Sequence, residues 1–102
     1  MDFQSRKKIV DACSLMVNDQ IGFIEGCRKL DSLRSQFDLS EDPDFLPVVG
    51  VTSETDDYPE QSIRENFSED DLKRVDEEVS SYVSMVRPSI IEACNLLIAK
   101  YK

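Results

Sequence analysis

The chain has 102 residues, enough for a single domain over residues 1–102 but too few for two cores of ordinary size. Its 21 acidic residues outnumber 12 basic ones, and the formal net charge of −9 argues against direct binding to nucleic acid or to an anionic membrane. No histidine is present, which excludes a histidine base, a Cys–His pair and a His-ligated metal.

The N-terminal segment is charged and leads into no uninterrupted apolar stretch of signal-peptide length. No apolar run approaches the roughly 20 residues that span a bilayer. These patterns predict a cytoplasmic protein without membrane association. Cys13, Cys27 and Cys94 are odd in number and widely spaced, and they form no C-x-x-C pattern. They are expected to be buried free thiols rather than a disulfide framework or a zinc site.

Two helices are predicted in the first third of the chain, over about residues 4–17 and 20–37. Apolar residues of the first recur at offsets 0, 3, 4 and 7, which is typical of a helix that buries one face: Ile9, Ala12, Cys13 and Met16. The apolar residues of the second, Phe23, Cys27, Leu30 and Phe37, fall at spacings of 4, 3 and 7, which also place them on one helical face. Gly22 and Gly26 form a G-x-x-x-G pattern that favours one close helix crossing.

A long connection is predicted over residues 38–60, because this segment holds three of the four prolines and no helical periodicity beyond one turn. Its central stretch, Phe45 to Val51, is too apolar to remain in solvent. We expect this stretch to lie extended against the helices, with Pro47 and Gly50 disfavouring a regular paired strand.

A third helix is predicted to begin after Ser68, which precedes three acidic residues and can cap the helix N-terminus. Its apolar positions are Leu72, Val75, Val79, Tyr82 or Val83, and Val86. Pro88 is expected to kink or end this helix and to open a fourth. That helix carries Ile91, Cys94, Ile98 and Tyr101, broadened by Ile90 and Leu97. The predicted fold is all-α: a four-helix antiparallel bundle with a long acidic loop between the second and third helices.

The predicted loop concentrates the negative charge of the protein. Residues 38–60 contain no lysine or arginine, whereas the other 79 residues hold 13 acids and 12 bases. The eight acids of the loop are Asp38, Glu41, Asp42, Asp44, Glu54, Asp56, Asp57 and Glu60. One interpretation is a loop kept soluble by its charge. The functional interpretation is a docking surface for a positively charged partner, with Tyr58 as an aromatic contact beside the carboxylates.

Clustered carboxylates also suggest a divalent metal site, but the spacing is wrong for a calcium loop. Asp38, Ser40 and Asp42 match the first three ligand positions, whereas Pro43 replaces the turn glycine and Val49 replaces the bidentate glutamate. Paired carboxylates can also hydrolyse glycosides, yet the chain is small and shows no aromatic sugar platform. We therefore expect no enzymatic activity, no metal and no cofactor.

A second acidic cluster accompanies the predicted third helix, where basic residues are interleaved with acids. This mixture is typical of a solvated helix face. Should this helix lie beside the loop, Glu69, Asp70 and Glu77 would extend the negative surface.

Three segments together resemble a family of small helical bacterial proteins that includes immunity proteins of contact-dependent growth inhibition systems. They are Ile21-Gly22-Phe23-Ile24-Glu25-Gly26-Cys27-Arg28-Lys29-Leu30, Ser53-Glu54-Thr55-Asp56-Asp57-Tyr58-Pro59 and Ile90-Ile91-Glu92-Ala93-Cys94-Asn95-Leu96-Leu97. The resemblance implies a small cytoplasmic protein that binds and blocks the toxic domain delivered by a neighbouring cell, often a nuclease. We expect a monomer in isolation, because the apolar stripes are no wider than the core of a monomer requires. It assigns no functional residue to a numbered position.

The charge pattern favours the same class of partner, because nuclease domains are usually basic where they hold phosphates. The expected function is therefore stoichiometric occlusion of a basic toxin domain. Two alternatives use the same acidic surface: a cytosolic adaptor or regulatory binding protein, and an acidic mimic of nucleic acid.

Overall fold

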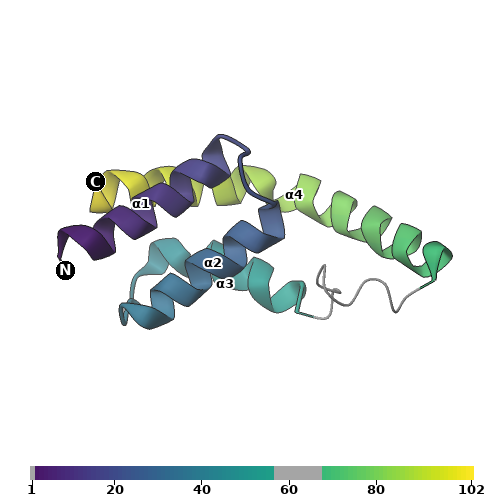
Figure 1. Cartoon of the computed structure of the whole chain (residues 1–102), viewed down its shortest axis with the longest axis horizontal. Coiled ribbons are helices and arrows are strands. Elements are labelled where there is room, and N and C mark those ends of the chain that lie inside the picture. Colours follow the sequence, from purple (N-terminus) through teal and green to yellow (C-terminus); the bar gives the residue numbers. More distant parts are fainter. Residues whose placement is uncertain (1, 57–67) are drawn as a thin grey trace.

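The computed structural model describes residues 2–56 and 68–102, and within these residues all regular secondary structure is helical, with no strand (Figure 1). The α-helices are α1 (Phe3–Val17), α2 (Phe23–Gln36), α3 (Leu46–Glu54) and α4 (Glu69–Tyr101). A short 3-10 helix, η1 (Pro43–Phe45), directly precedes α3. The predicted all-α class is confirmed.

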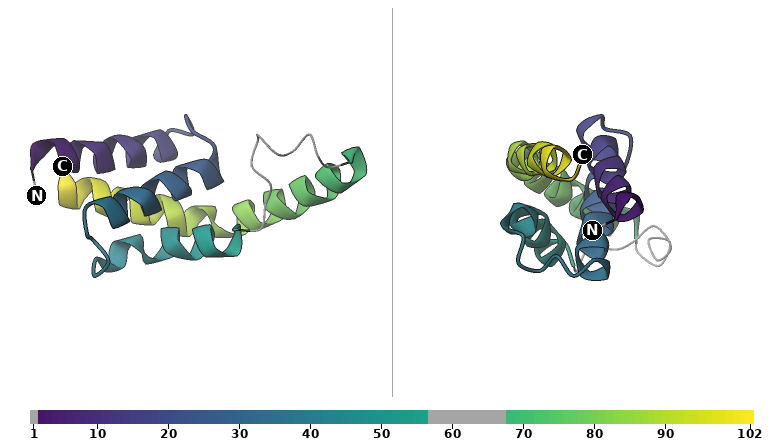
Figure 2. Two further views of the ribbon diagram at one scale, coloured as in Figure 1. Left: turned by 60° about the horizontal axis from the view of Figure 1, so that its bottom comes forward. Right: turned by 90° about the vertical axis from the view of Figure 1, so that its left-hand side faces the viewer.

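The helices form two layers. One contains α1 beside the C-terminal part of α4, and the other contains α2 beside α3 (Figures 1 and 2). Because α1 also packs against α2 and α3 against α4, each helix has two neighbours. The two chain ends lie at one end of the molecule, whose principal extents are 46 × 24 × 24 Å. At the opposite end the first turns of α4 project beyond the other helices (Figure 1).

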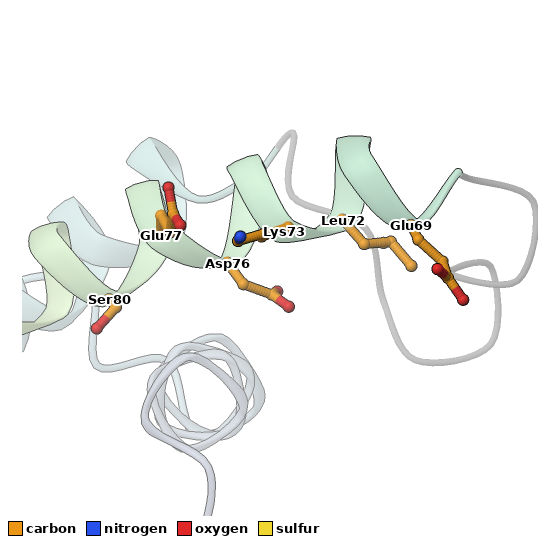
Figure 3. Close-up of a pocket in the computed structure, with 6 residues that line it drawn as sticks. All are labelled: Glu69, Leu72, Lys73, Asp76, Glu77 and Ser80. Carbon is orange, nitrogen blue, oxygen red and sulfur yellow. The ribbon is translucent and has the colours of Figure 1, made fainter.

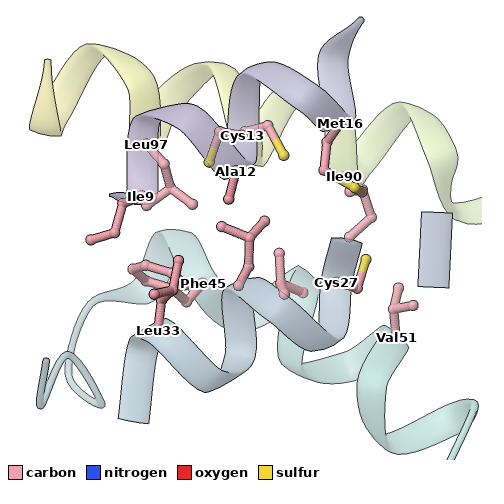
Figure 4. Packing of buried hydrophobic residues seen from close by; sticks show 13 residues of the cluster. Ile9, Ala12, Cys13, Met16, Cys27, Leu33, Phe45, Val51, Ile90 and Leu97 are labelled. Carbon is pink, nitrogen blue, oxygen red and sulfur yellow. The ribbon is translucent and has the colours of Figure 1, made fainter. Parts of the chain in front are cut away.

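The core lies between the two layers (Figure 4). It is built from the inward stripes of all four helices together with Phe45 of η1, which is fully buried. The buried cluster comprises Ile9, Ala12, Cys13, Met16, Cys27, Leu30, Leu33, Phe45, Val48, Val51, Ile90, Cys94 and Leu97. The expected burial of the three cysteines as free thiols is confirmed. The stripe predicted for the first helix is also confirmed, since all four of its residues are buried.

Both N-terminal helices end in the same way, with an aspartate in the left-handed region. Asp19 (φ 56°) follows α1 and Asp38 (φ 55°) follows α2. After α2, the Leu39 amide donates to the Arg34 carbonyl at 2.8 Å and the Asp38 amide donates to the Ser35 carbonyl. This is the Schellman pattern, in which a left-handed residue reverses the chain and satisfies the last helical carbonyls. Asp38, a predicted binding residue, therefore also terminates α2.

The expectation for Phe45 to Val51 is wrong, because this stretch is helical rather than extended. Asp42 caps η1 by accepting a hydrogen bond from the Asp44 amide at 3.0 Å. Pro47 lies in the first turn of α3, where no intrahelical N–H is needed. Phe45, Val48 and Val51 are spaced three residues apart, so the helix turns all three into the core. Helix formation thus buries side chains that an extended chain would alternate between core and solvent.

Of the two outcomes expected at Pro88, a kink or a helix end, the helix end is wrong, because α4 continues through Pro88 as one helix of 33 residues. Proline has no N–H, so the Ser84 carbonyl loses its helical partner. Both Ser84 and Pro88 are exposed, which leaves that carbonyl accessible to water. Burial is confined to the C-terminal half, where Ile90 is the first buried residue of α4. Val79, expected in the core, is only half-buried.

Gly26 marks the close crossing expected from the G-x-x-x-G pattern, whereas Gly22 is the exposed N-cap of α2. A Cβ atom on Gly26 would lie 1.9 Å from Sδ of Met16 and 3.1 Å from Cγ2 of Ile21. Met16 is 2% exposed and has little room to move. The absent side chain therefore allows α1 and α2 to pack closely.

We expect Gly26→Ala to lower the free energy of unfolding by about 1–3 kcal/mol through overpacking, although alanine is the better helix former. Urea denaturation followed by circular dichroism measures this loss. The matched control is Gly50→Ala in α3, where a Cβ atom meets nothing within 4 Å and a small gain in stability is expected. Equal effects at the two positions would contradict the packing described for Gly26.

Candidate docking surface

The structure separates the predicted binding residues into two sets and leaves three outside its described part. Asp57, Tyr58 and Glu60 lie outside residues 2–56 and 68–102. Asp42 and Asp44 point into an internal contact with the end of α4. The remaining four are exposed at the surface: Asp38, Glu41, Glu54 and Asp56.

The internal contact joins η1 to the C-terminal turn of α4. Nζ of Lys100 lies 2.8 Å from Oδ1 of Asp42 and 2.7 Å from Oδ2 of Asp44. The hydroxyl of Tyr101 donates a hydrogen bond to the second oxygen of Asp42. The Asp42 side chain is only 7% exposed, so this carboxylate is desolvated and fully hydrogen-bonded. Asp42 and Asp44 therefore hold α3 against α4 and present little free charge to a partner.

The electrostatics of this cluster match its geometry. Burial alone would raise the pKa of Asp42, but hydrogen bonds from Lys100, Tyr101 and the Asp44 amide outweigh it and lower that pKa below its ordinary value. The pKa of Lys100 is raised by hydrogen bonds to Asp42 and Asp44. Burial and the Asp42 contact raise the pKa of Tyr101 to about 12. At neutral pH Asp42 and Lys100 are therefore charged, and the Tyr101 hydroxyl is protonated.

Asp42→Asn is expected to lower the free energy of unfolding at pH 7 by about 1–3 kcal/mol, because it removes the charge that Lys100 faces. A carboxylate whose pKa is depressed by folding stabilises the protein above its unfolded pKa of about 3.9. That contribution is lost as the pH falls through the folded pKa. The difference between wild type and variant should therefore shrink below about pH 4.

Thermal unfolding from pH 7 to pH 2 measures this convergence. The control is Asp11→Asn, which breaks the exposed pair between Lys7 and Asp11 and should change stability by less than about 1 kcal/mol. A stability difference between wild type and Asp42→Asn that stayed constant down to pH 2 would contradict a charged Asp42 in the folded protein.

The four exposed acids flank α3. Asp38 and Glu41 lie in the turn before η1, and Glu54 and Asp56 lie at the C-terminal end of α3. No hydrogen bond or ion pair within the described residues engages these four carboxylates. A helix of nine residues rises about 13 Å, so α3 separates two small groups of free negative charge.

The C-terminal end of α3 carries negative charge, which the helix dipole disfavours at that end. Glu54 and Asp56 lie at the negative end of the helix, and the last turn contains no basic residue. Nη2 of Arg28 on α2 donates to the Thr55 carbonyl at 2.9 Å and so caps this end from a neighbouring helix. Thr55 is buried, whereas Asp56 is exposed. Arg28 thus stabilises the backbone and leaves both carboxylates in solvent.

The projecting N-terminal arm of α4, residues 69–80, is a second acidic surface. It contains six acids and two bases. A shallow pocket runs along it, and Figure 3 shows its lining side chains on this single helix: Glu69, Leu72, Lys73, Asp76, Glu77 and Ser80. Leu72 is the only apolar residue of this pocket. A hollow formed by one helix is a contact surface rather than an enclosed active site.

Among the described residues, no group of three or more Cys, Asp or Glu side chains is arranged to hold a metal ion. In the same part of the chain, no helix combines the length and the apolar character that crossing a membrane requires. Comparison with protein-family models, curated proteins and solved structures found no match to this chain.

Proposed function

We propose that this protein is an immunity protein that binds a cognate toxin domain with a basic surface, of the nuclease type, and blocks it by stoichiometric occlusion. The observation that carries the proposal is the set of four exposed carboxylates around α3, which have no internal partner among the described residues. An inhibitor of a phosphate-binding groove needs free anionic groups on a rigid support.

The arrangement of charge supports rapid capture of such a partner. Exposed acids lie at both ends of α3 and along the α4 arm, where six acids outnumber two bases. With a net charge of −9, the protein has a field that attracts a basic surface. Opposite charges accelerate association, and a toxin that has entered a cell must be bound before it acts.

Inhibition by occupancy requires no catalytic group on the inhibitor. The chain has no histidine, and its three cysteines are buried, with burial raising the pKa of the Cys27 thiol to about 12. A thiol with such a pKa is protonated at neutral pH and is a poor nucleophile. The proposed mechanism is therefore binding without turnover, by a monomer whose helices hold the acidic groups in place.

The proposal is tested by co-expressing this chain with the C-terminal domain of the protein encoded directly upstream of its gene. The expected result is restored growth of cells that the upstream domain would otherwise kill, together with a 1:1 complex in analytical ultracentrifugation. An upstream gene that encodes no toxic domain, or a toxic domain that neither binds nor is neutralised, would overturn the proposal. In that event a stable complex with a non-toxic protein would indicate an adaptor, and one with a DNA- or RNA-binding protein would indicate a nucleic-acid mimic.

A further inference from the structure

The outer face of α3 exposes apolar residues to solvent at its N-terminal end. The inner face of the helix places Val48, Val51 and Thr55 in the core. On the outer face Leu46 is 57% exposed, and Pro47 and Gly50 are exposed as well. No other described residue buries Leu46 and Pro47, so this part of the outer face is available for contact with a partner.

Gly50 is the second unusual feature of this face. A glycine inside a helix is less favourable than alanine by about 1 kcal/mol, so its presence normally has a local reason. Gly50 has none within the described residues, because its φ angle is not positive and a Cβ atom there would meet nothing within 4 Å. Gly26 shows the contrast, since Met16 fills the space where its Cβ would lie. An absent side chain on an exposed face leaves room for another backbone to approach closely.

The charges around the face determine the kind of partner that fits it. Glu54 is one helical turn from Gly50 on the outer side, and Asp56 follows it. Leu46, Gly50 and Ser53 recur at offsets of four and three and so form a line along the helix that ends beside Glu54. The exposed apolar residues therefore have a charged rim at the C-terminal end of the helix. A second copy of the chain would bring like charges together, so the face is complementary to a basic partner instead.

We infer that the outer face of α3, centred on Gly50, is the docking site for a helix of a basic protein, with small or apolar residues at the crossing and lysine or arginine facing Glu54 and Asp56. The inference rests on the proposed function only in needing a basic protein partner. It deepens that proposal by assigning the centre of the contact to Leu46, Pro47 and Gly50 and the rim to Glu54 and Asp56. The α4 arm is then outside the primary contact.

The test places a photo-crosslinking benzoylphenylalanine at Ser53 of the full chain in its native cells, with Ser89 on the exposed side of α4 as the matched control. The expected result is one covalent adduct from position 53, mapped by mass spectrometry to a helix flanked by lysine or arginine, and at least about tenfold less adduct from position 89. Any of four results would overturn the inference: an adduct only with a second copy of this chain, an adduct with an acidic peptide, equal labelling from both positions, or no adduct.

Two substitutions at Gly50 separate binding from folding. Gly50→Ala should raise the thermal midpoint by about 2–8 °C, because it restricts the unfolded chain and meets free space in the folded one. Gly50→Leu should leave the fold intact but reduce the adduct from position 53 at least about tenfold, since its side chain occupies the crossing. Ser89→Leu is the control for an added apolar side chain and should leave the adduct unchanged. An undiminished adduct in Gly50→Leu would overturn the inference.

The identity of the adduct distinguishes this inference from the proposed function. A toxin domain as the captured protein supports both. A basic protein that is not a toxin supports the α3 surface and contradicts the immunity function. Growth rescue by a chain that gives no adduct from position 53 supports the immunity function and contradicts the α3 surface.

Discussion

Phe45→Ala should lower the free energy of unfolding by about 3–5 kcal/mol. Phe45 is fully buried at the junction of η1 and α3, where its ring fills the space between α2, α3 and α4. Truncation leaves a cavity that the surrounding helices cannot close without losing other contacts. A loss of this size is a large part of the total stability of a domain of about 100 residues.

Urea denaturation monitored by circular dichroism measures the effect, and the adjacent residue supplies the control. Leu46 is 57% exposed, so Leu46→Ala should change stability by less than about 0.5 kcal/mol. The contrast between these two neighbours tests the register of α3 directly. Similar losses for both variants, or no loss for Phe45→Ala, would show that the helix is rotated or absent.

Neutralising the four exposed acids should slow association with the toxin domain at least about tenfold, whereas the fold stays intact. The variant combines Asp38→Asn, Glu41→Gln, Glu54→Gln and Asp56→Asn. Each change preserves the shape of the side chain, and asparagine tolerates the left-handed conformation at position 38. The loss is expected because exposed charges act mainly on the rate of encounter.

The matched control removes four exposed charges elsewhere, with Asp11, Asp19, Glu25 and Glu92 changed to the corresponding amides. It has the same net charge, so it separates a local docking surface from the effect of overall acidity. Stopped-flow association rates should fall with added salt for wild type and control, as the Debye length shortens to about 8 Å at 0.15 M. The association rate of the variant that lacks the four acids around α3 should vary little with salt. Equal rates for the two variants would reject the acids around α3 as the docking surface.

The first two helices could be predicted from the sequence because their apolar residues follow a clear helical period and their ends carry a turn. The α3 region could not, because proline, glycine and β-branched residues in Phe45 to Val51 suggested an extended chain. The signal that identifies this helix is the spacing of Phe45, Val48, Val51 and Thr55, all of which are buried. Pro47 and Gly50 are compatible with a helix because one lies in its first turn and the other faces solvent.

The candidate site was predictable in composition but not in arrangement. The eight acids without a single base between them are evident in the sequence. Nothing in the spacing indicates that Lys100 and Tyr101, almost 60 residues away, hold Asp42. Such pairing depends on how α3 packs against α4, which is a tertiary property. The contact divides the acids into those that stabilise the fold and those that remain free for a partner.

Alkylation of the three buried cysteines can measure the local unfolding of the helices that carry them. The cysteines lie on α1, α2 and α4, and each is fully buried. Burial raises the pKa of Cys27 to about 12, and the core shields all three thiols, so each reacts with an alkylating reagent only after its helix has separated from the core. Residue-resolved alkylation rates therefore report local unfolding free energies at three sites. Equal rates at the three sites would indicate one cooperative unit, and unequal rates would identify the helix that opens first.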